Sequence, residues 1–276
     1  MHFLFKQKAD VRHTALMKWL FLFSQRQPSS VSSYNFVPYK YGPYSFEAQQ
    51  DLSQSLARYV EDANGGFRLR TEVENEVTTI TDKIKASDLL HANEVWSSFA
   101  ELAHQDLLDK VYSAYPWYAS RSVLITHVPQ DDADIAVYTS GYEGKSVDAF
   151  FATLLEHGIR GVLDVRRIAY SHKYGFSGAT LQRLCSKLAI TYDHLPELGV
   201  ASELRKDLFG AEAFGKLFDD YEAKLPENSE ALCKAGEIVK SRPTTLMCFE
   251  ATSECCHRGR LAPRIAAQTN LQVKHL

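Results

Sequence analysis

The sequence predicts an α/β protein in which a mainly helical N-terminal domain precedes a C-terminal domain with a mostly parallel sheet and helices on both faces. Two patterns predict this architecture. In the second half of the chain, short apolar runs alternate with amphipathic segments, as in a parallel sheet whose strands are joined by helical crossovers. In the first half, helical periodicity dominates and one Gly-rich turn marks a hairpin.

The length of 276 residues allows two domains, and a content of 45% hydrophobic and 24% charged residues is typical of a globular chain. A polar segment over residues 122–134, which contains Pro129 and three aspartates, is the best linker. We therefore expect one domain over residues 1–130 and an α/β domain over residues 131–276. The net charge of −3 does not by itself indicate a nucleic-acid or membrane partner.

In the N-terminal domain, apolar residues recur at helical spacing in four segments, and Ser45 is a suitable N-cap for the second. The turn Asn64-Gly65-Gly66, followed by the alternating run of residues 67–81, predicts a hairpin. The expected helices are residues 14–24, 46–61, 86–102 and 107–114.

In the C-terminal domain, five apolar runs have the length of strands, and Ser146 is a suitable N-cap for the first helix between them. The expected strands are residues 135–138, 161–165, 190–195, 244–249 and, as an edge strand, 271–275. The expected helices are residues 146–155, 179–188, 214–225, 229–240 and 261–268. The C-terminal half therefore predicts a sheet with a helix after each of its first strands.

Helices, a hairpin and closing helices within about 120 residues indicate a winged-helix type of module. The segments Tyr41-Gly42-Pro43-Tyr44-Ser45 and Leu108–Tyr112, with Tyr115-Pro116-Trp117-Tyr118, carry a further resemblance. They resemble winged-helix-like modules fused to other domains in bacteria and phages, including the SocA-like, Panacea-type antitoxin-associated group. The resemblance implies that residues 1–130 bind DNA or a protein.

Residues 1–46 contain six basic residues and one acidic residue. This local excess is compatible with a surface that contacts a nucleic-acid backbone, and the alternative is an ordinary solvated face. We therefore expect DNA as a partner through residues 1–46 and the rim of the ligand pocket described below.

The unusual polar residues of the C-terminal domain follow its predicted strands. Because ligands of open parallel sheets bind beyond the carboxyl ends of the strands, we expect these residues to form one site. They are Gly141, Tyr142 and Glu143 after the first strand, Asp164 and Arg166 after the second, His194 after the third, and Cys248, Glu250, Cys256, His257 and Arg258 after the fourth.

These segments strongly resemble the DUF488 family, a prokaryotic domain of unknown function. The resemblance is carried by Tyr138-Thr139-x-Gly141-Tyr142-Glu143-Gly144, Asp164-Val165-Arg166, Tyr192-x-His194-Leu195-Pro196-x-Leu198-Gly199 and Cys248-x-Glu250 with Cys256-His257-Arg258. It covers residues 135–270 and implies an α/β fold with a shared pocket, but no reaction. Arg167-Ile168-Ala169 stands here where the family often has a proline, so this loop departs from the family pattern.

Asp164 and the two arginines each allow two roles. Asp164 is either a salt-bridged structural carboxylate or a general base. Arg166 and Arg258 either clamp a phosphate or carboxylate, or neutralise Asp164 and Glu250. Since two arginines balance two acids, we expect a small anionic or nucleobase ligand with at most one phosphate.

Cys256 precedes a predicted helix, where backbone N–H groups and the helix dipole lower the pKa of a thiol. Because adjacent side chains usually point apart, we expect any dyad to pair Cys256 with His172 or His194 and not with His257. The alternative is a buried cysteine beside a histidine that caps carbonyls. We assign Asp164, Glu250, Cys256 and His257 as catalytic candidates, and Gly141, Tyr142, Glu143, Arg166, His194 and Arg258 as substrate-binding candidates.

Cys248, Cys255, Cys256 and His257 fall within ten residues. The paired Cys-x₂₋₄-Cys spacing of structural zinc sites is absent, so we expect no metal and no other cofactor. The segment Gly141-x-x-Gly144-Lys145-Ser146 lacks the spacing of a P-loop, and the Gly-x-Ser-x-Gly, His-Glu-x-x-His and dinucleotide-binding motifs are absent. Standard hydrolases, zincins and dehydrogenases are therefore disfavoured.

The combined features predict an enzyme that acts on a nucleotide or a modified nucleobase, with glycosidic-bond hydrolysis as in a DNA glycosylase and with an N-terminal module that binds DNA. The first alternative is a non-catalytic regulator that senses a ligand and binds DNA or a protein. The second is an interaction protein of a phage-defence or toxin–antitoxin kind. Five cysteines and no apolar signal segment predict a cytoplasmic protein without a membrane partner.

Overall fold

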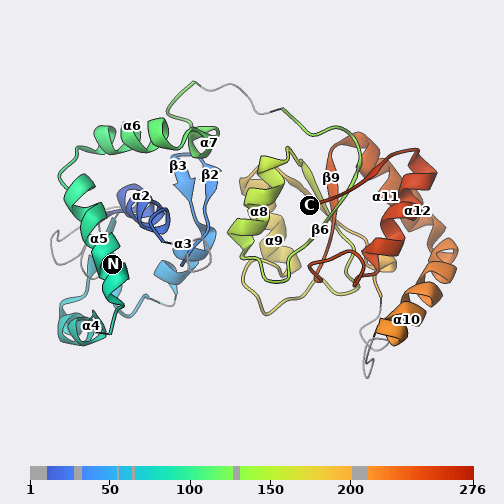
Figure 1. Ribbon diagram of the computed structural model, residues 1–276, viewed down its shortest axis with the longest axis horizontal. Coiled ribbons are helices and arrows are strands. Elements are labelled where there is room, and N and C mark those ends of the chain that lie inside the picture. The colour runs from blue at the N-terminus through green and yellow to red at the C-terminus, as the bar shows by residue number, and fades with distance from the viewer. Residues whose placement is uncertain are drawn as a thin grey trace. The chain divides into compact units, whose positions relative to one another are not determined.

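A computed structural model describes residues 11–27, 33–54, 56–63, 66–81, 83–126, 131–200 and 211–276 (Figure 1). The chain divides into two compact units, Met1–Pro129 and Gln130–Leu276. Within the described residues, no helix is long and apolar enough to cross a membrane.

The two ends of the predicted linker segment, residues 122–134, make contacts within different units. At its start, the Val123 N–H donates to the carbonyl oxygen of Lys40 at 2.9 Å, within the N-terminal unit. At its end, the Ala133 N–H donates to the carbonyl oxygen of Gly158 at 3.0 Å, and Asp132 pairs with Arg160. Val123 therefore belongs to the N-terminal unit, and residues 131–134 belong to the C-terminal unit.

The described part of the N-terminal unit contains helices and two small antiparallel sheets. The helices are α2 (His13–Ser24), α3 (Phe46–Ser53), α4 (Glu74–Thr81), α5 (Ala86–Phe99), α6 (His104–Ala114) and α7 (Pro116–Ala119), with a 3-10 turn η1 (Thr71–Val73). The strands β1 (Val11–Arg12), β5 (Gly66–Leu69) and β4 (Val60–Ala63) form one sheet in that order, and β2 (Val37–Tyr39) pairs with β3 (Gly42–Tyr44).

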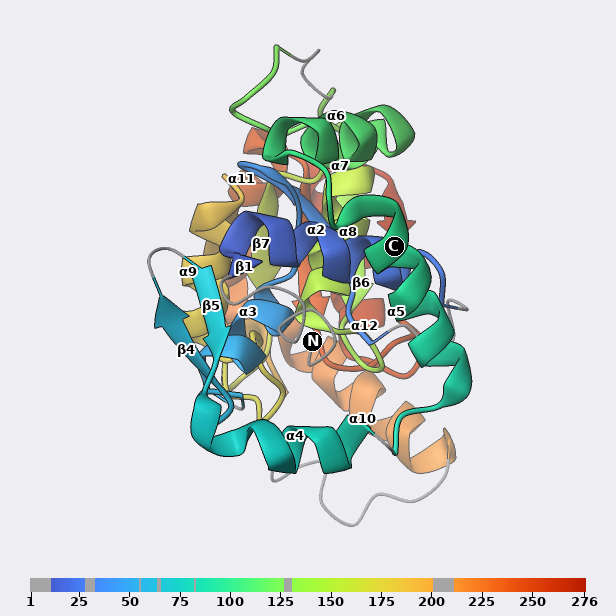
Figure 2. The ribbon, with the colours of Figure 1, turned by 90° about the vertical axis from the view of Figure 1, so that its left-hand side faces the viewer.

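Helix α2 runs through the middle of this unit, beside α5 and α6 (Figure 2). Its Phe21 is fully buried and meets the rings of Phe36, Tyr115 and Tyr118 edge to face, with centroids 4.5–5.3 Å away. Such aromatic contacts add to the stabilisation from burial alone. The apolar periodicity of residues 14–24 thus supplies the centre of the N-terminal core.

Two expectations for this unit are corrected. The helix from residue 46 begins as predicted, with the Ser45 hydroxyl accepting from the Ala48 N–H at 3.1 Å, but it ends at Ser53. The hairpin forms between β4 and β5, and the run 67–81 is a strand only to Leu69 before it becomes α4. Val73 and Val77 are four residues apart, which is a helical spacing. The prediction gave more weight to the alternating pattern of residues 67–81 and therefore extended the strand too far. Asn64 and Gly65 lie outside the described residues.

Fewer basic residues are available for the predicted nucleic-acid surface of residues 1–46 than the sequence indicates. Lys18 is only 1% exposed, so it cannot contact a nucleic acid, and Arg26 lies 3.6 Å from the carboxylate of Glu94. Arg12 and Lys40 are exposed, whereas Lys6 and Lys8 lie outside the described residues. The winged-helix assignment of this unit remains a prediction.

The described residues of the C-terminal unit form a five-stranded, fully parallel sheet in the order β10-β6-β9-β7-β8. The strands are β6 (Val137–Gly141), β7 (Gly161–Asp164), β8 (Thr191–His194), β9 (Thr244–Cys248) and β10 (Val273–His275). Gly141 pairs with Cys248, and Asp164 pairs with both Met247 and His194. The carboxyl ends of four strands therefore meet at one edge, as predicted.

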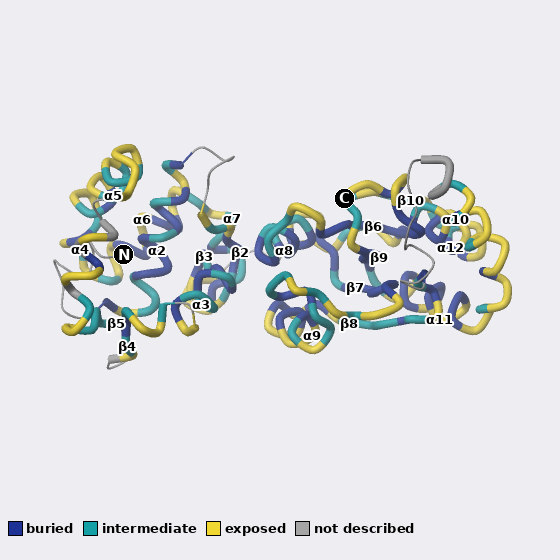
Figure 3. The backbone as a smooth tube through the Cα atoms, turned by 90° about the horizontal axis from the view of Figure 1, so that it is seen from below, coloured by how far each residue is buried: buried dark blue, intermediate teal, exposed yellow. Residues whose placement is uncertain are grey.

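Helices cover both faces of this sheet, which confirms the predicted α/β class. Figure 1 shows α8 (Val147–Glu156) and α9 (Gly178–Lys187) on one face, and α11 (Ser229–Ser241) and α12 (Arg258–Thr269) on the other, near α10 (Ala211–Lys224). The strands β6, β7 and β9 are buried along their whole length, and the exposed residues lie on the outer sides of the helices (Figure 3). Burial on both faces explains why these strands read as continuous apolar runs.

Candidate active site

The loops that follow β6 and β9 are joined directly by hydrogen bonds. The Glu143 N–H donates to the carbonyl oxygen of Phe249 at 2.8 Å, and the Glu143 carboxylate accepts from the Ala251 N–H at 2.9 Å. A Cβ atom on Gly141 would lie 1.8 Å from the carbonyl oxygen of Glu250, so only glycine fits at this position. Gly141 and Glu143 therefore set the path of the loop after β9.

Asp164 and Arg166 form a buried ion pair. Arg166 donates from Nε to Oδ1 of Asp164 at 2.8 Å and from Nη2 to Oδ2 at 2.5 Å, and its backbone N–H donates to Oδ1 at 3.1 Å. The Tyr192 hydroxyl donates to Oδ2 at 2.8 Å, and Asp164 has no exposed surface. Four hydrogen bonds occupy this carboxylate, so the geometry favours the structural role of Asp164 over that of a general base.

The guanidinium group of Arg166 is directed into the protein. It also donates to the Tyr142 hydroxyl and to the carbonyl oxygen of Phe176, both at 2.9 Å. Burial acts to lower the pKa of Arg166, but hydrogen bonds and the charge of Asp164 outweigh it and raise the pKa above its usual value. His194 donates from Nε2 to the carbonyl oxygen of Arg166 at 2.8 Å, so His194 holds the loop after β7.

Arg258 is 1% exposed and donates to backbone carbonyl groups. Its Nη1 and Nη2 atoms donate to the carbonyl oxygens of Glu250 and Ala251 at 2.6 and 2.9 Å. Since Arg166 and Arg258 are both committed to protein acceptors, the geometry does not support the predicted anion clamp. Arg258 instead fixes the loop after β9.

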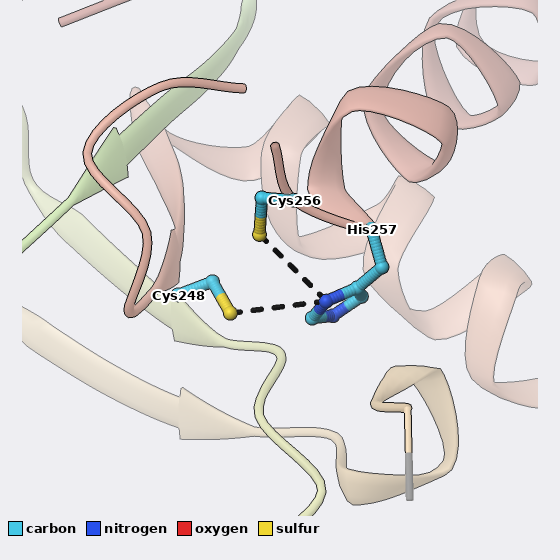
Figure 4. A group of neighbouring side chains, drawn as sticks. All are labelled: Cys248, Cys256 and His257. Carbon is cyan, nitrogen blue, oxygen red and sulfur yellow. Dashed lines mark hydrogen bonds between the residues drawn. The ribbon is translucent and has the colours of Figure 1, made fainter. Parts of the chain in front are cut away.

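Cys248, Cys256 and His257 form a buried cluster between β9 and α12, which we call the sulfur–imidazole cluster (Figure 4). The Nδ1 atom of His257 lies 3.8 Å from Sγ of Cys248 and 3.7 Å from Sγ of Cys256. Nε2 of His257 lies 3.0 Å from the carbonyl oxygen of Val165, which can only accept, so Nε2 carries the proton. Nδ1 of His257 faces both sulfur atoms.

The two thiols of the cluster ionise differently. A hydrogen bond from Cys256 lowers the pKa of Cys248, with His257 acting in the same direction, while burial and the nearby Glu250 oppose this shift. Burial raises the pKa of Cys256, and the neighbouring Cys248 sulfur raises it further. The predicted lowering of the Cys256 pKa is therefore wrong, because its sulfur is buried beside a second sulfur.

The expectation that Cys256 and His257 point apart is also wrong. His257 has helical backbone angles, with φ −57° and ψ −24°, and the Cys256 N–H donates to the carbonyl oxygen of Ser253. In this tight turn, adjacent side chains do not alternate as they do in a strand. His172 lies 3.3 Å from the Tyr170 hydroxyl and His194 binds Arg166, so the two predicted dyads with Cys256 are not formed.

Two cavities flank the cluster. The first, of about 500 Å³, is called the Tyr142 pocket and is lined by Tyr142, Arg166, Arg167, Ile168, Tyr170, Ser171, His172, Lys173, Val200, Cys248, Phe249 and His257. The second, of about 930 Å³, is called the Glu250 pocket. Its lining includes Glu143, Phe249, Glu250, Cys255 and Cys256.

The structure thus divides the predicted site residues into three groups. Tyr142, Arg166 and His257 line the Tyr142 pocket, whereas Glu143, Glu250 and Cys256 line the Glu250 pocket. Gly141, Asp164, His194 and Arg258 line neither pocket and support the loops behind them. The sequence placed Cys248 at a strand end within the expected site, but it assigned Cys248 no catalytic or substrate-binding role.

One comparison with known families bears on this site. Residues 146–265 match the family model described as Domain of unknown function DUF488. This DUF488 region runs from the start of α8 into α12 and includes the Asp164–Arg166 pair and the whole sulfur–imidazole cluster. No curated protein and no solved structure matches the chain. The resemblance of the N-terminal unit to winged-helix modules has no family match here.

Proposed function

We propose that the DUF488 domain is an enzyme that acts on a nucleotide or nucleobase bound in the Tyr142 pocket, and that the N-terminal unit binds DNA. The lining of this pocket carries the proposal, because it combines aromatic rings, cationic groups and the two reactive side chains Cys248 and His257. A volume of about 500 Å³ lies within the range of small-molecule sites.

The aromatic residues favour a planar ligand. The ring of Tyr142 stacks on Phe176 with centroids 4.1 Å apart, and Phe249 meets Tyr142 edge to face at 5.3 Å. Phe249 and Tyr170 are nevertheless 45% and 61% exposed at the pocket. A base that stacks on such an exposed ring gains about 1–3 kcal/mol, so these side chains suit a nucleobase.

The charges favour one anionic group. No carboxylate is among the described residues that line the Tyr142 pocket, whereas Arg167 and Lys173 are. Arg166 adds little net charge, since Asp164 neutralises it. Arg167 and Lys173 have no ion pair among the described residues, and two such cations suit a single phosphate, such as that of a mononucleotide or of a nucleotide within a strand.

Glu250 is the carboxylate best placed to assist hydrolysis. Its Oε2 atom accepts from Sγ of Cys248 at 3.3 Å, and Cys248 lines the Tyr142 pocket while Glu250 lines the Glu250 pocket. Asp164, by contrast, is buried and accepts four hydrogen bonds. We therefore propose Glu250 as the acid–base group for cleavage of a glycosidic bond, with the target base extruded from its strand if the substrate is duplex DNA.

The test is a panel of nucleosides, mononucleotides and oligonucleotides with modified bases, with binding measured by calorimetry and products by mass spectrometry. We expect one class to bind and to be cleaved, and Phe249→Ala and the double variant Arg167→Gln/Lys173→Gln to weaken binding at least tenfold. Arg183→Gln, which changes an exposed cation on α9 away from both pockets, is the control and should bind as the wild type.

Absence of binding across the whole panel would overturn the proposal. Binding without turnover would favour the ligand-sensing regulator, for which Glu250→Gln should change the affinity for the ligand and nothing else.

A further inference from the structure

We propose that Cys248, Cys256 and Nδ1 of His257 form a zinc site. The three donor atoms all lie within 4.8 Å of one another and are drawn together in Figure 4. Two thiolates and one imidazole are a donor set that zinc prefers in proteins.

The distances are close to those that a tetrahedral zinc ion requires. Zn–S bonds of about 2.3 Å and Zn–N bonds of about 2.0–2.1 Å place a sulfur and a nitrogen ligand about 3.6 Å apart. The distances from Nδ1 of His257 to the two sulfurs are 3.7 and 3.8 Å. The two nitrogen–sulfur pairs therefore need shifts of only a few tenths of an ångström to bind zinc. The two sulfur atoms, which lie within 4.8 Å of each other, need to approach to about 3.8 Å.

The surroundings of His257 are those of a metal ligand. Its Nε2–H donates to the carbonyl oxygen of Val165 at 3.0 Å, which fixes the tautomer and aims Nδ1 at the sulfurs. Ligating histidines almost always have such a partner for their second ring nitrogen. The ring is 1% exposed, and Tyr221 packs against it edge to face at 5.3 Å, so the orientation of the imidazole is set before any ion binds.

The loop between the ligands is also fixed in advance. Arg258 donates to the carbonyl oxygens of Glu250 and Ala251, and this holds the residues that separate Cys248 from Cys256. The ligands come from a strand end and from the turn before a helix, and not from two zinc knuckles. This explains why the spacing of the cysteines argued against a metal.

Three protein ligands leave one position for water. The cluster lies between the two pockets, with Cys248 and His257 lining one and Cys256 and Glu250 lining the other. A zinc ion with three protein ligands lowers the pKa of its bound water to about 7 and thereby supplies a nucleophile. This catalytic role, unlike the zinc site itself, rests on the proposed function.

The test measures the metal content of the full chain, prepared without a histidine tag. We expect one zinc per chain by mass spectrometry, and substitution by cobalt should give the intense visible bands of a tetrahedral site with thiolate charge transfer. Cys248→Ser, Cys256→Ser and His257→Ala should each lower the zinc content at least fivefold. Cys255→Ser is the matched control, since Cys255 is an exposed neighbour and should retain full zinc.

The wild type provides a second measurement that does not depend on the folding of variants. After removal of metal by a chelator, titration with zinc should give one tight site and release protons from the thiols. A wild type that takes up no zinc, or cluster variants that keep it as Cys255→Ser does, would overturn the site. Zinc binding without nucleotide binding would support the zinc site and count against the proposed function. Turnover by the zinc-free protein would support the proposed function and refute the catalytic role of zinc.

Discussion

At the scale of single residues, the Asp164–Arg166 pair shows how a motif that suggests catalysis can serve the fold. Both side chains are nearly or fully buried, at 0% and 7% exposure, and their polar atoms are satisfied by each other and by Tyr142, Tyr192 and Phe176. Removing one member of such a pair leaves the other charged and buried without its partner.

We predict that Asp164→Asn lowers the free energy of unfolding of the C-terminal unit by about 3–5 kcal/mol, because Arg166 stays buried without its counter-ion. Urea denaturation followed by circular dichroism measures this loss. Asp193→Asn is the control on the neighbouring strand β8, since its pair with Arg242 is about one-third exposed and should contribute under about 1 kcal/mol. Equal, small losses for the two variants would assign Asp164 a role other than structural.

At the scale of elements, helix α2 carries a buried charge. Lys18 is 1% exposed and its Nζ donates to the carbonyl oxygen of Tyr41 at 2.7 Å. Burial lowers its pKa from the ordinary value of 10.5 to about 8. At neutral pH, the N-terminal unit therefore folds with a charged amine inside, which opposes stability.

We predict that Lys18→Met stabilises the N-terminal unit at pH 7 by about 1–2 kcal/mol. The variant removes the cost of burying a charged amine, and this gain is partly offset by the loss of the hydrogen bond to Tyr41. The gain should shrink as the pH rises from 8 toward 10.5, because in this window the unfolded wild type binds a proton that the folded form has lost, so the wild type gains stability. His104, whose pKa is lowered by burial and by the charges of Lys18 and Arg12, is already neutral there.

Tryptophan fluorescence suits this measurement, since Trp19, Trp96 and Trp117 are the only tryptophans and all lie in the N-terminal unit. Lys83→Met, at an exposed position before α5, is the control and should change stability by less than about 0.5 kcal/mol. A gain from Lys18→Met that stays constant between pH 7 and 10 would contradict the buried-charge explanation.

At the scale of the whole molecule, the sequence predicted the sheet well because its strands are buried on both faces and its helices are amphipathic. It also predicted which strand ends meet, since parallel strands share one edge. It did not predict that Cys248 joins Cys256 and His257, because the path of the loop from residue 249 to 255 is set by long-range contacts to Gly141, Glu143 and Arg258. The burial of Lys18 likewise depends on a long-range contact, namely its hydrogen bond to the carbonyl oxygen of Tyr41, which lies 23 residues away in the sequence.

The separation of the two units leads to a last prediction. The described cores do not share residues: one contains Phe21 and its neighbours from residue 11 to 119, and the other runs from Val137 to Ile265. A fragment of residues 131–276 retains the Asp132–Arg160 pair and all five strands, so we expect it to fold alone and to unfold cooperatively.

If the N-terminal unit binds DNA as proposed, this fragment should bind a mononucleotide as the full chain does. It should bind oligonucleotides more weakly and with a smaller dependence on salt, because the fragment neutralises fewer phosphates. Calorimetry over a range of salt concentrations measures both quantities. An unchanged salt dependence would assign all nucleic-acid contacts to the C-terminal unit, and loss of mononucleotide binding by a folded fragment would mean that the Tyr142 pocket needs the N-terminal unit.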